Sequence, residues 1–140
     1  MFSGSAPFLS AYFATDYVVF FGTRQIGIRP SIRSADIEKL LRRRKVRATA
    51  FITAFNPRGV DVGRSRNLAA NRRLTALLRR AGYPVLSGEG RGDIGRWQPE
   101  PSLLALGIGG KRAALVGGRF GQNAIVYVKR GQPAELMRLR

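Results

Sequence analysis

Three polar segments, far apart in the chain, carry side chains that could bind a ligand. Each segment places amide, hydroxyl or carboxyl groups beside an apolar run. Such groups hold small molecules by hydrogen bonds when a fold brings them around one hollow. The candidate ligand-binding residues are Thr53, Asn56, Arg64, Asn67, Trp97, Glu100, Gln122 and Asn123. The hypothesis requires that these distant stretches of chain converge on a single cleft.

Carboxylates also gather in one stretch, because Glu89, Asp93 and Glu100 belong to only eight acidic residues in the chain. Paired carboxylates can perform acid–base hydrolysis or hold Mg²⁺. In a chain with so many arginines, ordinary ion pairing explains the same acids. A carboxylate-dependent hydrolase is therefore an alternative function, for which the catalytic residues stay unknown.

The same stretch is rich in glycine, with Gly88, Gly90 and Gly92 at every second position. Three glycines in five residues permit backbone shapes that other residues resist, and we expect a loop here. No Gly-Lys-Ser/Thr follows, so a Walker-type nucleotide site is not supported.

The absence of cysteine and histidine narrows the chemistry further. It excludes disulfide scaffolds, thiol nucleophiles, Ser-His-Asp triads and imidazole bases. It also excludes metal sites built from thiolate or imidazole ligands. We expect no metal site, and no motif indicates a particular cofactor.

The charge balance points toward anionic partners. Lysine and arginine number 25 against eight acids, which leaves a net charge of +17. Such a field attracts phosphate-rich polymers, although a general bias toward arginine would produce it too. Nucleic-acid binding predicts a basic stripe that joins residues 42–47 to the outer face of a helix at 65–81.

That helix carries two kinds of polar residue. Asn67 and Asn71 fall on or beside the apolar arc that includes Leu74 and Leu78, while arginines occupy the opposite side. An unpaired amide on a core face costs roughly 1–3 kcal/mol. Asn67 therefore either ties down the preceding loop or faces a ligand cleft.

Apolar periodicity and turn residues predict ten elements in the order αββαβαββαβ. The predicted helices cover residues 7–15, 34–44, 65–81 and 111–119, and the predicted strands cover 17–21, 25–29, 46–55, 83–86, 102–108 and 123–129. This order favours the α/β (α+β) class, as a single-domain sandwich of a mixed β-sheet with helices packed on it. No linker divides residues 1–140, so we expect one globular domain.

The apolar runs are too short to cross a bilayer, and no cation precedes the apolar N-terminal stretch. We expect a cytoplasmic protein with no membrane partner. The oligomeric state cannot be read from these features.

Several blocks together resemble a known family. They are AFITAFNP at residues 50–57, GEGRG at 88–92, WQPEPS at 97–102 and FGQNAIVY at 120–127, with Asn67 between the first two. The combination is similar to a family of small bacterial proteins described only as a domain of unknown function. The resemblance implies one compact domain and no particular activity. Its recurring polar residues match Thr53, Asn56, Asn67, Trp97, Glu100, Gln122 and Asn123.

These observations favour a binding module with a polar cleft for a small anionic or nucleotide-like ligand. Arg58, Arg64 and Arg66 stand near the start of the helix at 65–81 and would supply positive charge to that cleft. Nucleic-acid binding through the arginine-rich surface is the alternative. The arginine load is not part of the family pattern, which argues against nucleic-acid binding as a function shared by the family.

Overall fold

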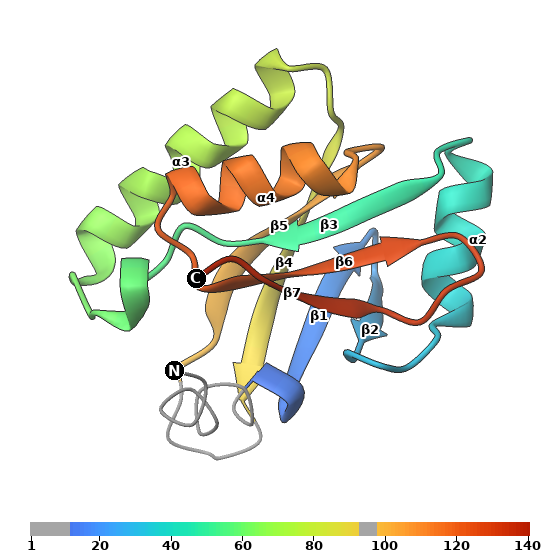
Figure 1. Ribbon diagram of the computed structural model, residues 1–140, viewed down its shortest axis with the longest axis horizontal. Coiled ribbons are helices and arrows are strands. Elements are labelled where there is room, and N and C mark those ends of the chain that lie inside the picture. The colour runs from blue at the N-terminus through green and yellow to red at the C-terminus, as the bar shows by residue number, and fades with distance from the viewer. Residues whose placement is uncertain (1–11, 93–97) are drawn as a thin grey trace.

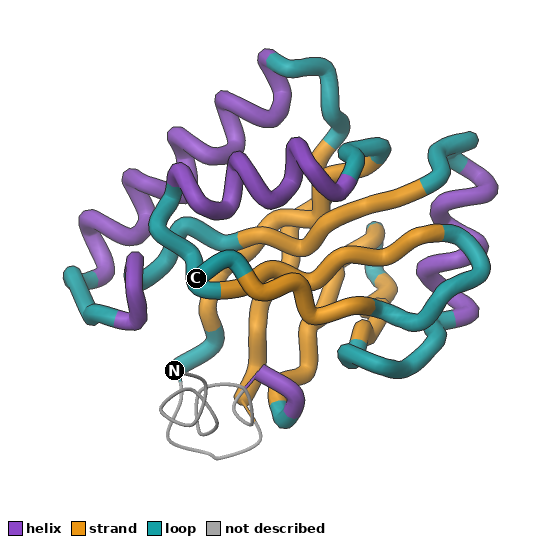
Figure 2. The backbone as a smooth tube through the Cα atoms, in the orientation of Figure 1, coloured by secondary structure: helices purple, strands orange, loops and turns teal. Residues whose placement is uncertain are grey.

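The computed structural model describes residues 12–92 and 98–140, which form a seven-stranded sheet with helices packed on it (Figures 1 and 2). The strands are β1 Thr15–Phe21, β2 Arg24–Ile28, β3 Ala48–Ile52, β4 Val85–Gly92, β5 Glu100–Leu106, β6 Ala124–Lys129 and β7 Glu135–Arg138. The helices are α2 Ala35–Arg43, α3 Arg64–Arg80 and α4 Gly110–Arg119, with a short 3₁₀ turn at Pro57–Gly59. The α+β class is confirmed, and so is the predicted succession of elements from the strand at 17–21 to the strand at 123–129.

The sheet has the order β2-β1-β4-β5-β3-β6-β7, and every pairing between these strands is antiparallel. The expectation of a mixed sheet is therefore wrong. Two interlocked crossovers explain the difference. The unit β3-α3-β4 has β5 inserted between its strands, and the unit β5-α4-β6 has β3 inserted between its own. This is the split βαβ arrangement of ferredoxin-like folds, in which each helix crossover skips one strand.

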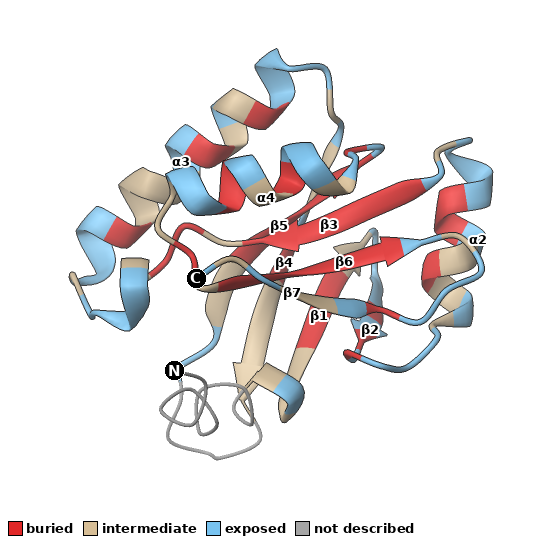
Figure 3. Cartoon of the chain, viewed as in Figure 1, coloured by how far each residue is buried: buried red, intermediate tan, exposed pale blue. Residues whose placement is uncertain are grey.

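The core has two layers, one on each face of the sheet. On one face, α3 and α4 pack over Ala50, Ile52 and their neighbours. On the other, α2 packs near one end of the strands, and its Ile37, Leu40 and Leu41 join Phe51 in a second cluster. All five residues of β3 are buried (Figure 3), as is typical of a central strand covered on both sides. We call these surfaces the α3/α4 face and the α2 face.

Two residues in the N-terminal half define where local elements begin and turn. Ser34 caps α2, since its hydroxyl accepts a hydrogen bond from the Ile37 N–H at 3.2 Å. Gly22 turns the β1–β2 hairpin with φ of +63°. The predicted helix at 7–15 lies largely outside the described residues. Of its described part, Tyr12 and Phe13 are helical, and β1 begins at Thr15.

Two segments differ from the sequence prediction. The glycine-rich stretch is not a loop but the second half of β4, which pairs with β1 on one side and β5 on the other. Residues after 129 include β7, a further strand paired with β6. At four residues, β7 is too short to show a clear period in the sequence. Within the described ranges, every helix is too short or too polar to span a membrane.

Candidate ligand-binding site

A cavity of about 270 Å³ lies on the α2 face, at the strand ends away from α2. Antiparallel pairing places the C-terminal end of β3 at the same sheet edge as the N-terminal ends of β5 and β6. Polar residues at those three ends therefore meet, although they are far apart in sequence. Five of the candidate ligand-binding residues line the cavity, namely Thr53, Asn56, Glu100, Gln122 and Asn123.

The row of glycines on β4 creates space for this cavity. In a strand, alternate residues share a face, so Gly88, Gly90 and Gly92 leave one track of the α2 face without side chains. Gly88 lies against Phe51, and a Cβ atom there would come within 2.9 Å of the Phe51 ring and still closer to the Val18 carbonyl oxygen. Gly90 and Gly92 line the cavity directly.

Asn56 stands at the centre of a hydrogen-bonded network. Its backbone N–H donates to Asn67 Oδ1 at 2.8 Å, and Asn67 Nδ2 donates to Asn56 Oδ1 at 2.6 Å. Asn56 Nδ2 in turn donates to Glu100 Oε2 at 3.4 Å. The network runs from the buried side of α3 to a carboxylate in the cavity. Asn56 has φ of +47°, a left-handed conformation that asparagine tolerates better than most residues.

Other polar side chains fasten the walls to the main chain. Thr53 Oγ1 donates to the Pro101 carbonyl at 2.8 Å, and Asn71 Nδ2 donates to the same oxygen at 2.8 Å. Asn71 Oδ1 accepts from the Ala54 N–H at 2.8 Å. Gln122, 5% exposed, donates to the Phe55 carbonyl at 3.1 Å. These bonds hold the cavity walls in place, and of the three side chains Thr53 and Gln122 also line the hollow.

The remaining candidates occupy other positions. Asn67 is 3% exposed and sits behind Asn56, so it supports the wall instead of lining the cavity. Arg64 is exposed in the first turn of α3 and is not among the lining residues. Trp97 lies outside the described residues.

A family model described as "Protein of unknown function (DUF3293)" matches residues 52–125, more than half of the chain. The chain belongs to the DUF3293 family. This confirms the expectation that the chain belongs to a family described only as a domain of unknown function. The matched DUF3293 segment runs from the end of β3 to the start of β6 and contains all eight candidate residues. Neither the curated proteins nor the solved structures gave a match to the chain.

Glu100 is the one charged side chain among the described residues that line this DUF3293 cavity. Burial raises the pKa of its carboxyl above the ordinary 4.5, and the hydrogen bond from Asn56 opposes only part of that shift. Burial, together with the Glu100 charge, also raises the pKa of Tyr12 to about 12. Within the described part of the chain, no lysine or arginine forms an ion pair with Glu100.

Sequence reasoning missed the aromatic walls of the cavity. Tyr12, Tyr17, Phe51 and Phe55 all line it, and the Tyr17 and Phe51 rings meet edge to face with centroids 5.3 Å apart. The period of two that places Phe51 and Thr53 on one face of the predicted strand at 46–55 could have identified part of this surface. The contribution of Tyr17 depends on the β1–β4 pairing, which the sequence did not predict.

The paired-carboxylate arrangement required for hydrolysis is not formed by Glu89. Strand register pairs Gly90 with Glu100 and Glu89 with Pro101, so Glu89 lies on the opposite face of the sheet from Glu100. Glu89 instead accepts a hydrogen bond from Arg91 Nε at 2.5 Å. The other proposed partner, Asp93, is outside the described residues.

Proposed function

We propose that this DUF3293 protein is a small-molecule binding module whose site is the cavity on the α2 face. The ligand is a compact organic molecule that presents N–H donors to the Glu100 carboxylate and an apolar or aromatic body to the surrounding rings. A nucleobase, a nucleoside or a small aromatic amine has this chemistry. The proposal keeps the nucleotide-like ligand suggested by the sequence and replaces its anionic part with a donor group.

The observation that carries this proposal is the position of Glu100. In a chain of net charge +17, an acid is expected to find an arginine partner. Glu100 instead faces a cavity whose other described lining residues are uncharged, and an asparagine is its hydrogen-bond donor. A carboxylate in such surroundings gains most from a ligand that donates charge-assisted hydrogen bonds.

The size and walls of the cavity limit the ligand further. Sites for drug-sized molecules usually occupy about 300–1,000 Å³, so about 270 Å³ suits a smaller molecule. Aromatic residues offer ring surfaces for a flat body. The Arg58, Arg64 and Arg66 side chains are absent from the lining, so nothing among the described lining residues would neutralise a phosphate.

A thermal-shift screen tests this assignment. Nucleobases, nucleosides and small aromatic amines are compared with carboxylate and phosphate analogues of similar size. Donor ligands should raise the Tm of the wild type, and Glu100→Gln should weaken their affinity about tenfold, because a charge-assisted hydrogen bond is worth about 1.5–3 kcal/mol. Glu135→Gln is the matched control, since Glu135 is an exposed acid on β7 away from the cavity lining.

Two results would contradict the proposal. Equal stabilisation by anionic analogues would show that Glu100 does not select the ligand. An unchanged affinity in Glu100→Gln, with the ligand still bound, would place the binding site elsewhere on the protein.

A further inference from the structure

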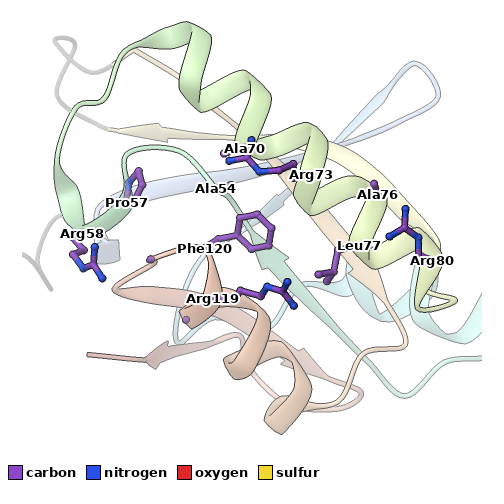
Figure 4. Close-up of a pocket in the computed structure, with 12 residues that line it drawn as sticks. Ala54, Pro57, Arg58, Ala70, Arg73, Ala76, Leu77, Arg80, Arg119 and Phe120 are labelled. Carbon is purple, nitrogen blue, oxygen red and sulfur yellow. The ribbon is translucent and has the colours of Figure 1, made fainter.

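A second hollow, of about 580 Å³, lies on the α3/α4 face in the groove between these two helices. Figure 4 shows Phe120 in the middle of this groove, with Arg73 and Arg119 on its two sides and Arg58 and Arg80 toward its two ends. The groove is separate from the cavity beside Glu100, and the two share no lining residue.

The groove is strongly and uniformly cationic. Four arginines line it, namely Arg58, Arg73, Arg80 and Arg119, and no acid does. Helices α3 and α4 together carry nine lysines and arginines and no acidic residue. Across residues 12–92 and 98–140, none of the four groove arginines forms an ion pair. Exposed like charges gathered around one hollow attract an anionic partner.

The local backbone holds Arg58 in place at the groove. Arg58 has φ of +57°, a left-handed conformation that is uncommon outside glycine. Its N–H donates to the Gly121 carbonyl at 2.7 Å. Gly121 itself has φ of +73° and packs so closely on Pro57 that a Cβ atom would lie 2.7 Å from the proline ring. Backbone strain of this kind persists only where the surroundings enforce it.

The spread of charge favours a chain of anions over a single one. Arg73 and Arg80 are two turns apart on α3, about 10 Å at 1.5 Å per residue. Arg119 faces them from α4, while Arg58 lies on the loop before α3 (Figure 4). One small anion cannot contact cations distributed over that length. Successive phosphates of a nucleic-acid backbone can.

The floor of the groove favours single strands over duplexes. Leu77 and the half-buried Phe120 line it, together with small residues such as Ala70 and Gly118. Single-stranded nucleic acids bind where a cationic groove follows the backbone and an aromatic ring stacks against a base. In a duplex the base faces are already stacked and are not available to Phe120.

We infer that the α3–α4 groove binds single-stranded nucleic acid, with its arginines on the phosphates and Phe120 against a base. The inference does not depend on the ligand proposed for the cavity. It also corrects the surface expected from the sequence. Helix α2, which carries Arg42 and Arg43, packs on the opposite face of the sheet from α3, so the predicted stripe from residues 42–47 to α3 is divided.

Fluorescence anisotropy with a labelled single-stranded 12-mer, measured over a series of salt concentrations, tests the groove. The Arg73→Ala/Arg80→Ala double variant should weaken binding at least tenfold and reduce the log–log salt slope by about 1.4 units, since each of two phosphate contacts contributes about 0.7. The control is Arg72→Ala/Arg79→Ala, which removes the same charge one position along the same helix, outside the groove lining. This control should weaken binding no more than threefold.

A third variant separates stacking from charge. Phe120→Ala should weaken binding at least fivefold, since stacking on an aromatic ring is worth about 1–3 kcal/mol per base, and it should leave the salt slope unchanged. Circular dichroism and Tm establish that each variant is folded. Glu100→Gln should bind the 12-mer like the wild type, so failure of the cavity proposal and failure of the groove proposal are distinguishable.

Three outcomes would overturn the inference. Equal losses in the two double-arginine variants would assign the affinity to the overall field of the protein. Equal affinity for a 12-base-pair duplex would remove the assignment to single strands. Absence of binding at low salt would exclude nucleic acid as the partner.

Discussion

The cavity on the α2 face and the groove between α3 and α4 lie on the two sides of one wall. Two short segments build that wall, residues 55–59 and 120–123. Asn56, Gly59, Gln122 and Asn123 line the cavity, whereas Pro57, Arg58, Phe120 and Gly121 line the groove. The cavity side of the wall presents amides, and the groove side presents an arginine and a phenyl ring.

The two sides differ in how their polar groups are satisfied. On the cavity side, Asn56, Asn67 and Gln122 bond to other parts of the chain. Among the described residues, no fully buried side-chain nitrogen or oxygen lacks a hydrogen-bond partner. The groove arginines are exposed to solvent, and none of them forms an ion pair with the part of the chain that the structure describes. Buried polar residues can therefore be explained by folding alone, while an exposed and unpaired charge cluster is better evidence for a partner.

The largest expected effect on stability comes from substituting a glycine in each of the two regions. Gly88→Ala should lower the free energy of unfolding by about 2–3 kcal/mol, because its methyl group would overlap the Val18 carbonyl and the Phe51 ring. Gly118→Ala, in the groove, should raise it by about 0.5–1 kcal/mol, since nothing lies within 4 Å and alanine favours the helix. Urea denaturation measures both.

Gly90→Ala is the control within the cavity. Its methyl group would meet only ordinary contacts, the nearest at 3.7 Å from Thr15 Cγ2, so stability should change by less than about 0.5 kcal/mol. The same methyl group would project toward the cavity and weaken ligand binding. A loss of stability equal to that of Gly88→Ala would show that the tight packing is not specific to position 88.

Asn67→Ala should act on both sides of the wall at once. It removes the acceptor for the Asn56 N–H and the donor for Asn56 Oδ1, so we expect a loss of about 2 kcal/mol in unfolding free energy. Because Asn56 and Arg58 belong to the same loop, binding in the cavity and in the groove should both weaken. Chemical denaturation and the two binding assays measure this.

Arg66→Ala is the matched control for Asn67. It alters the preceding, exposed position of α3 and should change stability by less than about 0.5 kcal/mol. If Asn67→Ala proved as mild as this control, the wall would not depend on the asparagine network.

Glu100 makes the stability of the protein depend on pH through the cavity side, whereas the groove-lining residues include no acid. Its folded pKa is raised, so the folded state holds a proton that the unfolded state has already lost. Stability therefore falls as pH rises from about 4.5 to the folded pKa and is constant above it. Glu100→Gln removes this fall in stability, because glutamine does not ionise, and its amide oxygen can still accept the hydrogen bond from Asn56. The Tm of Glu100→Gln minus that of the wild type should grow with pH over this window.

Glu135→Gln, at an exposed acid outside the cavity lining, again serves as the control. A Tm difference for Glu100→Gln that stayed constant from pH 4 to 8 would mean that the carboxyl is not buried enough to shift. The affinity of the cavity for its ligand should increase over the same pH range, because Glu100 ionises there. The affinity of the groove for nucleic acid should not change over that range.

The sequence could predict the convergence of Thr53, Glu100 and Gln122 because all three adjoin strong strand signals. Loops and ligand sites lie at the ends of strands, so residues that flank strands are often close together in the fold. Asn67 was left with two interpretations, and the structure supports the first: it ties down the loop through Asn56. The role of these residues in binding a ligand stays a prediction.

Other features could not be predicted because they depend on pairing between distant strands. The glycines of β4 suggest a loop until β1 and β5 are known to flank them. The insertion of β5 between β3 and β4 has no local signal, so a helix between strands suggested parallel neighbours. Arg73 and Arg80 lie on the helix face that the sequence predicts to be basic, whereas the sequence places Arg58 at the polar cleft instead. The position of Arg119 opposite them depends on the packing of α4.

The smallest expected effect tests whether the charges at the two ends of α3 lower or raise the stability of the protein. The first turn of α3 holds Arg64 and no acid, although the positive end of the helix dipole favours acids there. Arg64→Glu should raise the free energy of unfolding by about 0.5 kcal/mol relative to the wild type at low salt. Arg80→Glu makes the same charge change in the last turn, where it should lower stability by a similar amount.

Because both variants change the net charge equally, their difference isolates the dipole effect from the general repulsion among cations. That difference should be about 1 kcal/mol by urea denaturation at low salt and should shrink in 1 M NaCl, where the Debye length is about 3 Å. A loss of stability in Arg64→Glu would mean that Arg64 makes a stabilising contact of its own. A gain would show that α3 holds cations where folding favours acids, as expected if the arginines of this face serve an anionic partner.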